Sequence, residues 1–459
     1  MSPITRSIAT TAVVLLIVIS VLLLPAAAEY LMFHSDPERT GNVSGDAPVT
    51  GDLLWKTALH DTGYVGGGAC VAGGRVYVSN WAGWPITDER GLYCLNETTG
   101  EIIWQNPIGG TGGISTPAIS GGRVFVGSCT GDLYCVNALD GATIWDRTIE
   151  PNPLYWGVGS SPLIYNGTIF VNTVSDGALY AYDFDGNELW KITTTTGSYG
   201  GGSSAIYYIS PAAHDEMVFF GGAGPALHCV NIVTHDEVRN FSTSGTISTT
   251  PAIAGGMVFF ATDEPGERLH ALYLNGSEAW NTSLHCRLSS PAVAYGRVYI
   301  GDMDKHLNCL DSGNGSVIWS KPVDGPVKSS PVVAGGMVYV TGYTGTIYCF
   351  DADCGTLVWS DDTEGFNIAQ PAVSDKTLFI GSDSGYLYAF RDSPPLEGNL
   401  NHDGAVTAAD AIIALQIVVG AVPAVDAADV SGDGVVTSLD VLMILQVAAA
   451  VSTHDHLYA

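Results

Sequence analysis

The segment 329–340 reads SSPVVAGGMVYV, and variants of it recur along most of the chain. Seven copies keep the proline of Pro331, and Ala69 takes its place in the first copy. The successive intervals are 48, 45 and 49 residues, followed by four of 40. A fixed period of this length is typical of repeat architectures, so each copy is expected to form one structural unit. The prolines are Pro117, Pro162, Pro211, Pro251, Pro291, Pro331 and Pro371.

Each copy has the pattern of four short strands. In the copy at Pro331, a run ends at Gly335-Gly336, which favours a tight hairpin, and the alternating run 337–340 follows. The segments 345–350 and 356–359 then flank a polar turn. Four antiparallel strands in about 40 residues are typical of one propeller blade. Eight copies therefore predict an all-β eight-bladed β-propeller.

The ends of the repeat region predict how the ring closes. The segment Leu53-Leu54-Trp55 has the pattern of an outermost strand but precedes any complete blade, whereas the last copy stops at Phe390 without one. We therefore expect the N-terminal strand to complete the last blade, because closure protects strand edges that an open array exposes.

A tryptophan recurs in the outermost strand of the repeats. In the fifth occurrence of the slot, Arg239-Asn240 replaces it. A large ring at one fixed place in each repeat is best explained by packing between blades. The tryptophans are Trp55, Trp104, Trp145, Trp190, Trp280, Trp319 and Trp359.

These motifs carry a family resemblance. The segments 137–145 (NALDGATIW) and 311–319 (DSGNGSVIW) resemble the tryptophan-docking motif of quinoprotein-type (PQQ-like) propeller repeats. The segments 33–36 (FHSD) and 39–41 (RTG) also resemble the start of that family's repeat region. The resemblance covers about residues 30–391 and implies the fold, but many such propellers bind no cofactor.

Composition limits the partners. The chain has 46 acidic against 17 basic residues and a formal net charge of −29, which disfavours nucleic acid as a partner.

The nine cysteines do not suggest a disulfide framework, and their odd number leaves at least one thiol free in a monomer. Five of them share one slot with alanine in other repeats, which predicts a small buried position. These five are Cys94, Cys135, Cys229, Cys309 and Cys349.

The N-terminus has the pattern of an export signal. An apolar run, 12–24, is followed by small residues, which predicts a signal peptide over residues 1–28, cleaved before Glu29. The stretch 8–28 is also long enough to span a membrane if it is not cleaved. We expect a secreted or cell-surface protein. Seven glycosylation sequons permit glycan attachment, at Asn42, Asn96, Asn166, Asn240, Asn275, Asn281 and Asn314.

Beyond the propeller (29–391) and a short linker (392–398), a second module is expected over 399–450, followed by a tail (451–459). It contains two loops in which oxygen-bearing residues fall at positions 1, 3, 5, 7 (through the main-chain carbonyl), 9 and 12, the spacing of a calcium loop. We expect two Ca²⁺ sites, of which the first is weaker because it has fewer carboxylates. Their ligands would be Asn399, Asn401, Asp403, Ala405, Thr407 and Asp410, and Asp429, Ser431, Asp433, Val435, Thr437 and Asp440.

Each loop runs into an apolar helix, predicted over 408–419 and 438–448. We expect Ile412, Leu415, Leu442 and Leu445, among others, to pack one helix on the other. The aspartate that ends each loop resembles the dockerin F-hand. That resemblance implies a cohesin-like partner domain, which would dock on Ala408, Ala409, Ser438 and Leu439. An intramolecular clip folded onto the propeller is the alternative.

The long early repeats place their insertions on one face of the propeller, which is the expected binding side. Aromatic residues of these insertions could stack on sugars or contact a protein, or simply pack the loops onto the rim. Two cations should approach the central channel, where they could hold an anion or form a salt link to a neighbouring blade. The candidates are Trp81, Trp84, Tyr155, Trp156, Arg287 and Lys328.

Three functions are compatible with these features. The first is a secreted binding or scaffold protein whose propeller face binds a glycan or a protein, attached through its dockerin-like module and acting in polysaccharide handling. The second is a PQQ-dependent dehydrogenase, disfavoured because the chain has no Cys-Cys dipeptide and no evident carboxylate constellation near the channel. The third is a scaffold for membrane-protein assembly. We favour the first, without enzymatic activity or bound quinone.

Overall fold

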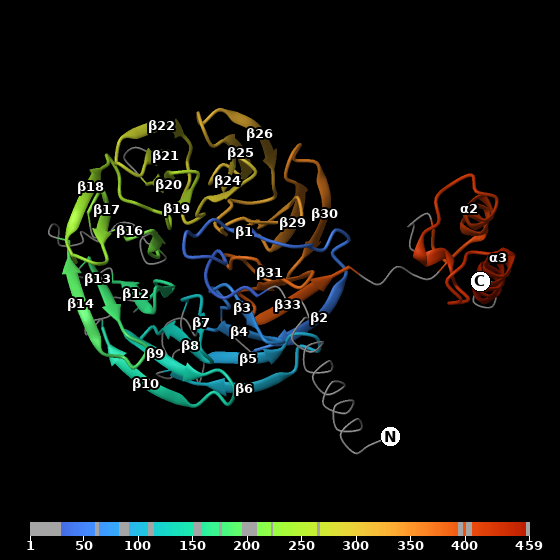
Figure 1. Ribbon diagram of the computed structural model, residues 1–459, viewed down its shortest axis with the longest axis horizontal. Helices are drawn as coiled ribbons and strands as arrows, with labels where there is room; N and C mark the ends of the chain where they lie inside the picture. Colours follow the sequence, from blue (N-terminus) through green and yellow to red (C-terminus); the bar gives the residue numbers. More distant parts are fainter. Residues whose placement is uncertain are drawn as a thin grey trace, which may run out of the picture. The chain divides into compact units, whose positions relative to one another are not determined.

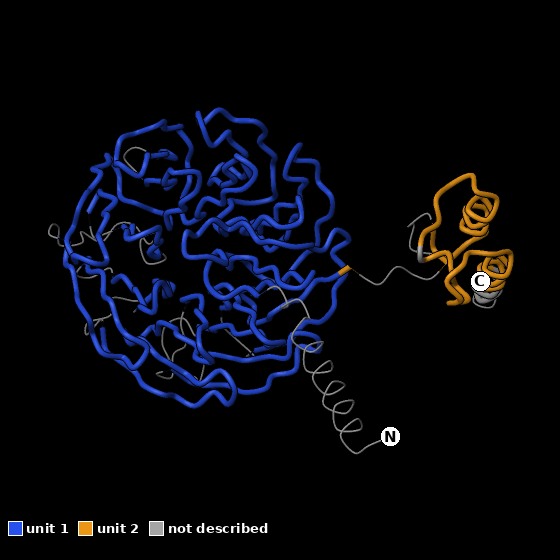
Figure 2. The backbone as a smooth tube through the Cα atoms, viewed as in Figure 1, with its two compact units in different colours: residues 1–391 blue, residues 392–459 orange. Residues whose placement is uncertain are grey.

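The computed structural model describes residues 29–59, 64–81, 91–108, 114–149, 158–173, 177–194, 209–221, 224–263, 267–392, 398–400 and 406–455. The chain divides into two compact units, residues 1–391 and residues 392–459 (Figure 2). The predicted signal peptide lies outside the described residues.

The first unit is an eight-bladed β-propeller of four-stranded antiparallel sheets, as the repeat predicts (Figure 1). The strands of blades 1 to 4 are β3 (Cys70–Ala72), β4 (Arg75–Ser79), β5 (Leu92–Asn96) and β6 (Ile102–Asn106); β7 (Ala118–Ser120), β8 (Arg123–Gly127), β9 (Asp132–Asn137) and β10 (Thr143–Thr148); β11 (Leu163–Tyr165), β12 (Thr168–Asn172), β13 (Ala178–Tyr182) and β14 (Glu188–Thr193); and β15 (Ala212–His214), β16 (Met217–Gly221), β17 (Ala226–Asn231) and β18 (Glu237–Ser242).

Blades 5 to 8 repeat the same order. Their strands are β19 (Ala252–Ala254), β20 (Met257–Thr262), β21 (Arg268–Tyr273) and β22 (Glu278–Ser283); β23 (Ala292–Ala294), β24 (Arg297–Gly301), β25 (His306–Asp311) and β26 (Val317–Pro322); β27 (Val332–Ala334), β28 (Met337–Thr341), β29 (Thr346–Asp351) and β30 (Leu357–Asp362); and β31 (Ala372–Ser374), β32 (Thr377–Gly381) and β33 (Tyr386–Arg391), completed by β2 (Leu53–Ala58). The two-residue strand β1 (Asn42–Val43) pairs in parallel with β27.

The second and third strands of each blade are almost entirely buried, because a neighbouring blade covers each face. In blade 6, residues 298–301 of β24 and residues 307–310 of β25 are all buried. The outer strand is instead largely exposed, and a register shift interrupts its pairing with the third strand in every blade. A bulge of this kind makes an exposed edge a poorer template for further strand pairing.

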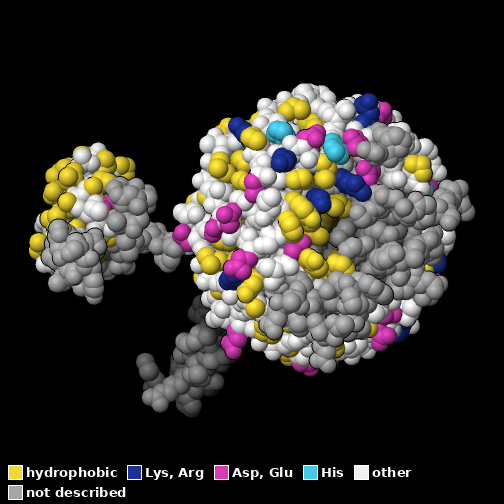
Figure 3. All heavy atoms as spheres, turned by 180° about the vertical axis from the view of Figure 1, so that it is seen from behind, with side chains coloured by type: hydrophobic (Ala, Val, Ile, Leu, Met, Phe, Trp, Pro, Cys, Tyr) yellow, Lys and Arg dark blue, Asp and Glu magenta, His cyan; other side chains and the backbone are white. Residues whose placement is uncertain are grey.

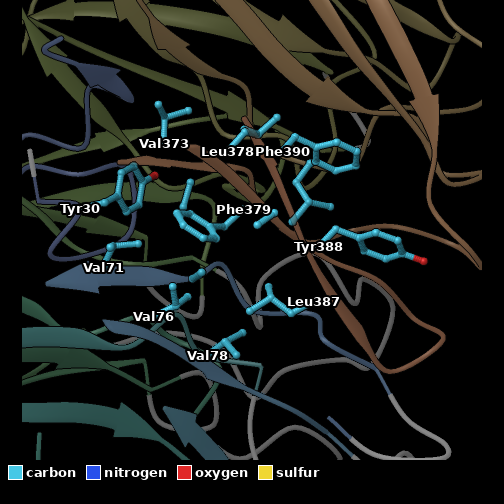
Figure 4. Close-up of a cluster of buried hydrophobic side chains, with 14 of the residues drawn as sticks. Tyr30, Val71, Val76, Val78, Val373, Leu378, Phe379, Leu387, Tyr388 and Phe390 are labelled. Atoms are coloured by element: carbon cyan, nitrogen blue, oxygen red, sulfur yellow. The ribbon is translucent and has the colours of Figure 1, made fainter. Parts of the chain in front are cut away.

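The ring closes as the sequence predicts. Strand β2 pairs with β33, and Trp55 lies opposite Ala389. Figure 4 shows the core at this seam, where Tyr30 and the valines of blade 1 face Phe379 and its neighbours from blade 8. Both ends of the propeller segment therefore contribute to one sheet, which leaves no blade with a missing strand.

The recurring tryptophans link each blade to the next. Six of the seven donate an indole N–H to a main-chain carbonyl of the following blade, over 2.8–3.4 Å. The ring lies against a glycine of that blade's turn: a Cβ placed on Gly315 would lie 2.4 Å from the Trp280 ring. Where Arg239 replaces tryptophan, its guanidinium Nη1 donates to Leu274 O over 2.6 Å. The arginine thus keeps the hydrogen bond but not the ring.

The second unit consists of α2 (Ala408–Val418), the short helix η3 (Asp426–Ala428) and α3 (Ser438–Asp455). Helix α3 continues through 455, so the predicted end at 448 is wrong. The helices pack through the core formed by Ala411, Ala414, Ile417, Val441 and Ile444, among others.

The predicted packing role of four other apolar residues is wrong. Ile412, Leu415, Leu442 and Leu445 are 58%, 47%, 52% and 41% exposed. In α2 the small side chains of Ala411 and Ala414 are buried in the core between the helices. The larger side chains that follow them in sequence, Ile412 and Leu415, therefore face solvent.

All nine cysteines lie among the described residues and form no disulfide with one another, and the five that share the repeat slot are buried. Within the described part of the chain, no helix combines the length and hydropathy that crossing a bilayer demands.

The docking glycines provide a test of the blade interface. Gly315 and Gly256 both have a positive φ (+72° and +77°), but only Gly315 faces a tryptophan; nothing lies within 4 Å of a Cβ on Gly256. Both alanine substitutions should cost about 1 kcal/mol of backbone strain. Gly315→Ala should cost roughly 1–3 kcal/mol more, because Trp280 must move. Denaturant unfolding of the two variants measures the difference, and equal destabilisation would contradict the docking role.

A candidate cavity at the propeller axis and two candidate calcium loops

The segment Tyr30–Val43 crosses the centre of the propeller and closes one end of its channel. The inner strands of several blades exchange main-chain hydrogen bonds with it over 2.7–3.0 Å. In Figure 1, the end of the segment, β1, lies beside β27 near the middle of the ring. The N–H donors on the blades are Val71, Ile119, Ala213, Ile253, Val293 and Val333, and their acceptors are Tyr30 O, Leu31 O, Pro37 O, Glu38 O, Thr40 O and Gly41 O.

Arg39 anchors this segment from inside. It is completely buried, and its guanidinium donates to the carbonyls of Phe33, Ser161, Pro162 and Pro211 over 2.6–3.3 Å. Burial lowers the pKa of Arg39 to about 10. Among the described residues, no carboxylate lies within ion-pair distance of it, so carbonyl dipoles from blades 3 and 4 carry the stabilisation of its charge.

A belt of hydroxyl groups surrounds the channel. The residue before the repeat proline is serine or threonine in six blades, and its oxygen accepts the N–H of the equivalent residue in the preceding blade. The six bonds measure 2.8–3.0 Å. The Ser-Pro or Thr-Pro dipeptide recurs at this position in the sequence, but the role of its hydroxyl group was not predicted from it. The acceptors are Thr116, Ser161, Ser210, Thr250, Ser290 and Ser330.

A cavity of about 40 Å³ lies inside this belt. That volume holds about three water molecules. Its wall combines Lys328 and Gln370 with four of the belt hydroxyls, and Phe33 of the crossing segment also lines it. The remaining lining residues are Gly66, Gly68, Ile114, Gly159, Leu288 and Ile368. A tricyclic quinone is much larger than this space, so the residues as placed do not fit that cofactor, and we derive no redox step.

Lys328 contributes the cavity's positive charge. Its ammonium lies 3.8 Å from the centroid of the Tyr343 ring, and Tyr343 stacks on Phe366 with centroids 4.9 Å apart. Among the described residues, no carboxylate lies within 4 Å of the ammonium. Burial, together with the nearby Arg287, lowers the pKa of Lys328, while Asp383 opposes that shift.

Asp383 lies near this lysine without forming an ion pair with it. Its N–H donates to Phe366 O over 2.9 Å, and its buried Oδ1 has no hydrogen-bond partner. Burial raises the pKa of Asp383 to about 7, although Lys328 opposes the shift. At neutral pH this carboxyl is therefore partly protonated, which weakens its compensation of the Lys328 charge.

Of the other predicted ligand residues, Arg287 forms an ion pair with Asp263 of blade 5 (3.3 Å) and does not line the cavity. Trp81 is half-buried and lies against Tyr64, with ring centroids 5.3 Å apart and main-chain hydrogen bonds in both directions. Trp84, Tyr155 and Trp156 lie outside the described residues. Figure 3 shows hydrophobic, basic, acidic and histidine side chains mixed on the described part of one face of the propeller.

In the second unit, the described part of the first loop presents an unused acceptor. Asn399 is buried, and its Oδ1 has no hydrogen-bond partner among the residues that the structure describes. Asp410 accepts from the N–H groups of Leu400 and Thr407 over 2.7 and 2.8 Å, and Thr407 caps helix α2. The predicted ligands Asn401, Asp403 and Ala405 lie outside the described residues. The amide oxygen of Asn399 fits the oxygen preference of Ca²⁺.

The second loop repeats this geometry. Asp440 accepts from the N–H groups of Ser431 and Thr437 over 2.9 and 2.7 Å. Burial would raise the pKa of Asp440, but these donors outweigh it and hold the value at about 2. Asp429 accepts from Gly434 N–H, and Asp433 from Val435 N–H. Within the described ranges, no three acidic, histidine or cysteine side chains converge on one point, so cation binding would require these carboxylates to turn inward.

The two helices expose equivalent surfaces. The predicted partner-contact residues Ala408, Ala409, Ser438 and Leu439 are all exposed at the two helix starts. Along each helix, burial follows the same order: in α2, Ile412 and Leu415 are exposed, as are Leu442 and Leu445 at the same places in α3. This internal repetition produces two similar apolar strips.

Comparison with family models matches both units. A model described as outer membrane protein assembly factor BamB matches residues 39–200 and 175–393. A model described as dockerin type I domain matches residues 397–446.

Among curated proteins, the chain is similar to outer membrane protein assembly factor BamB of Yersinia pestis, with 24% identity over 62% of this chain and 74% of that protein. BamB of Shewanella oneidensis is 24% identical over 52% of this chain and 61% of its own length. Tetrathionate hydrolase of Acidithiobacillus ferrooxidans is 27% identical over 40% and 39%. The chain thus spans between 39% and 74% of these relatives.

Among solved structures, the similarity extends to different functions. BamB from Moraxella catarrhalis aligns with a TM-score of 0.59, 17% identity, and 75% of this chain against 100% of that chain. Quinohemoprotein alcohol dehydrogenase from Comamonas testosteroni aligns with a TM-score of 0.65 at 13% identity, over 85% of each chain. At these identities the similarity shows the fold alone.

The raised pKa of Asp383 predicts a pH-dependent stability. An unfolded aspartate titrates near pH 3.9, so between about pH 4 and pH 7 only the folded state holds this proton. The contribution of Asp383 to stability therefore falls as pH rises through that window, by up to about 1.4 kcal/mol per unit. Asp383→Asn should gain stability over the wild type between pH 5 and pH 8, as measured by denaturant unfolding. Asp361→Asn, at an exposed carboxylate, is the control, and parallel curves for wild type and Asp383→Asn would refute the burial argument.

Proposed function

The chain belongs to the PQQ-like repeat family, whose model is described as outer membrane protein assembly factor BamB, and it ends in a dockerin type I domain; from this premise we propose a tethered binding protein. The propeller would bind a glycan or a protein on its open face, and the second unit would attach it to a cohesin-type partner. A role outside the cell in polysaccharide handling follows from this arrangement.

The match of residues 397–446 to the dockerin model carries this proposal. The two strips of exposed apolar residues on α2 and α3 support it, since exposed apolar patches on a small unit favour a protein partner. The cavity with Lys328 supports a binding role for the propeller. The secreted location is supported by the leader-like sequence of residues 1–28.

We also propose that this domain binds two Ca²⁺ ions, since dockerin type I domains generally bind calcium. The first site would use Asn399, Asn401, Asp403, Thr407, Asp410 and the Ala405 carbonyl. The second would use Asp429, Ser431, Asp433, Thr437, Asp440 and the Val435 carbonyl. Bound calcium would fix the starts of α2 and α3, where the partner would dock.

Assembly of membrane proteins is a second candidate, favoured by the similarity to the BamB relatives over as much as 62% of the chain. It would use the propeller, whereas the favoured function also needs the second unit. Deletion of residues 392–459 should therefore leave a membrane-assembly role intact and abolish attachment.

Cohesin attachment is tested with the full chain and a recombinant type I cohesin domain. We expect binding in Ca²⁺ that is lost in EDTA. Leu415→Glu combined with Leu442→Glu should weaken binding at least 100-fold, because two charges enter an apolar interface. Leu139→Glu alters a propeller residue that is 70% exposed and should have no effect. Failure of the wild type to bind cohesin, or full binding by the double variant, would refute the proposed attachment.

Calcium titration of the full chain by calorimetry should resolve a tighter and a weaker site. The second loop has three carboxylates and the first has two, and more negative charge favours the cation. Asp429→Ala should therefore weaken the tighter event at least tenfold, whereas Asn399→Ala should change only the weaker one. The opposite assignment, or one binding event in the wild type, would contradict the two-site proposal.

A further inference from the structure

We propose that the axial cavity binds the carboxylate of a terminal sugar acid, whose pyranose ring lies outside against Phe366 and Tyr343. This inference rests on the proposed binding role of the propeller and specifies its ligand. Hydrogen-bond donors, cavity size, the closed end of the channel and the exposed ring of Phe366 each support it.

The cavity presents donors suited to a carboxylate. Lys328 lines it, and its ammonium contacts the face of the Tyr343 ring. Four belt hydroxyls also line it, and each oxygen already accepts a main-chain N–H. Because these four hydroxyls have no acceptor among the described residues, their protons can be donated to a bound oxygen. They are Thr116, Ser161, Ser290 and Ser330, all at most 5% exposed.

The wall also includes an unpaired acceptor. Gln370 is 4% exposed, and its amide nitrogen donates to the Tyr30 hydroxyl, whereas its Oε1 has no partner. A buried carbonyl oxygen without a donor is costly, and a ligand hydroxyl or an accompanying water would satisfy it. Cation, hydroxyl donors and amide acceptor together suit a ligand that carries both a carboxylate and hydroxyl groups.

Size restricts what can enter. Room for about three waters accommodates a carboxylate but not a pyranose ring, so the ring must stay at the mouth. The segment Tyr30–Val43 closes the other end, and Phe33 from it reaches the cavity. A blind cavity admits the end of a chain rather than its middle, which favours a terminal residue.

An aromatic platform stands beside this lysine. Phe366 is 53% exposed and stacks on Tyr343. The ring of Tyr343 also contacts the Lys328 ammonium. An exposed ring of this kind suits the apolar face of a pyranose, and its neighbouring cation suits a carboxylate on the same sugar.

The charges of the protein favour a ligand with one negative charge at the cavity. The chain carries a net charge of −29, which repels long polyanions. At the cavity, however, Asp263 is paired with Arg287, and Asp383 lies beyond ion-pair distance of Lys328. The ammonium of Lys328 is therefore a local positive charge at the cavity, which a single terminal carboxylate can meet.

Calorimetry with the full chain tests the inference. The probes are trisaccharides that end in glucuronic or galacturonic acid at the non-reducing end, their methyl esters at that residue, and the neutral glucose and galactose equivalents. The ester keeps the ring and removes the charge. We expect the acids to bind the wild type at least tenfold more tightly than the esters, and Lys328→Gln to abolish this difference.

Two further variants separate the contributions of charge and ring. Phe366→Ala should weaken acid and ester alike, by about tenfold, because the ring contact is common to both. Lys305→Gln removes an exposed lysine that does not line the cavity and should leave all affinities unchanged. Thermal unfolding of each variant must match the wild type within a few degrees; Lys328→Arg, which keeps the cation, provides a second measurement if Lys328→Gln is destabilised.

The outcomes are distinguishable. If esters and acids bind the wild type equally, if Lys328→Gln keeps the preference for the acid, or if folded Lys328→Arg loses it, carboxylate recognition at the cavity is overturned while glycan binding by the propeller survives. If a neutral sugar binds best, the ligand class is wrong. If no saccharide binds the folded wild type, both this inference and glycan binding by the propeller fail, although cohesin attachment stands.

Discussion

The structure of the propeller depends on contact between neighbouring blades. The middle strands of each blade are buried on both faces, so a single blade would expose most of its apolar surface to water. Two sets of directional bonds fix how the blades meet: the tryptophan N–H bonds near the rim and the hydroxyl belt at the axis. Each bond contributes only about 1 kcal/mol, but where an interface carries both, the bonds act at its opposite ends and so limit both tilt and separation.

The N-terminal segment contacts the ring of blades in two ways. Strand β2 completes the last blade, and the preceding residues cross the centre to bond with the inner strands of several blades. Arg39 is the strongest anchor, because a buried guanidinium without its carbonyl partners would be very costly. One consequence is that the segment closes one end of the channel, so that the polar wall at the axis lines a cavity.

Sequence patterns identified the blades, the closure and the second unit, because these follow from local periodicity and turn chemistry. They were less informative about which apolar side chains are buried. Ile412 and Leu442 belong to strongly apolar helices, and nothing local distinguishes them from Ile417 and Ile444, which are buried. The belt was also missed, since a serine before proline has no evident role until eight copies are arranged around one axis.

By itself, the sequence determined that the chain forms a ring of eight repeats, that the segment Leu53-Leu54-Trp55 closes this ring, and that a dockerin-type unit follows, because each of these is encoded in residues close together along the chain or repeated at fixed intervals. Only the tertiary structure decided which residues surround the axis. Lys328, Gln370 and Phe33 are far apart in sequence and meet because closure of the ring brings the same position of every blade to one centre. Local sequence patterns do not predict that these residues meet, because their proximity arises from packing between blades.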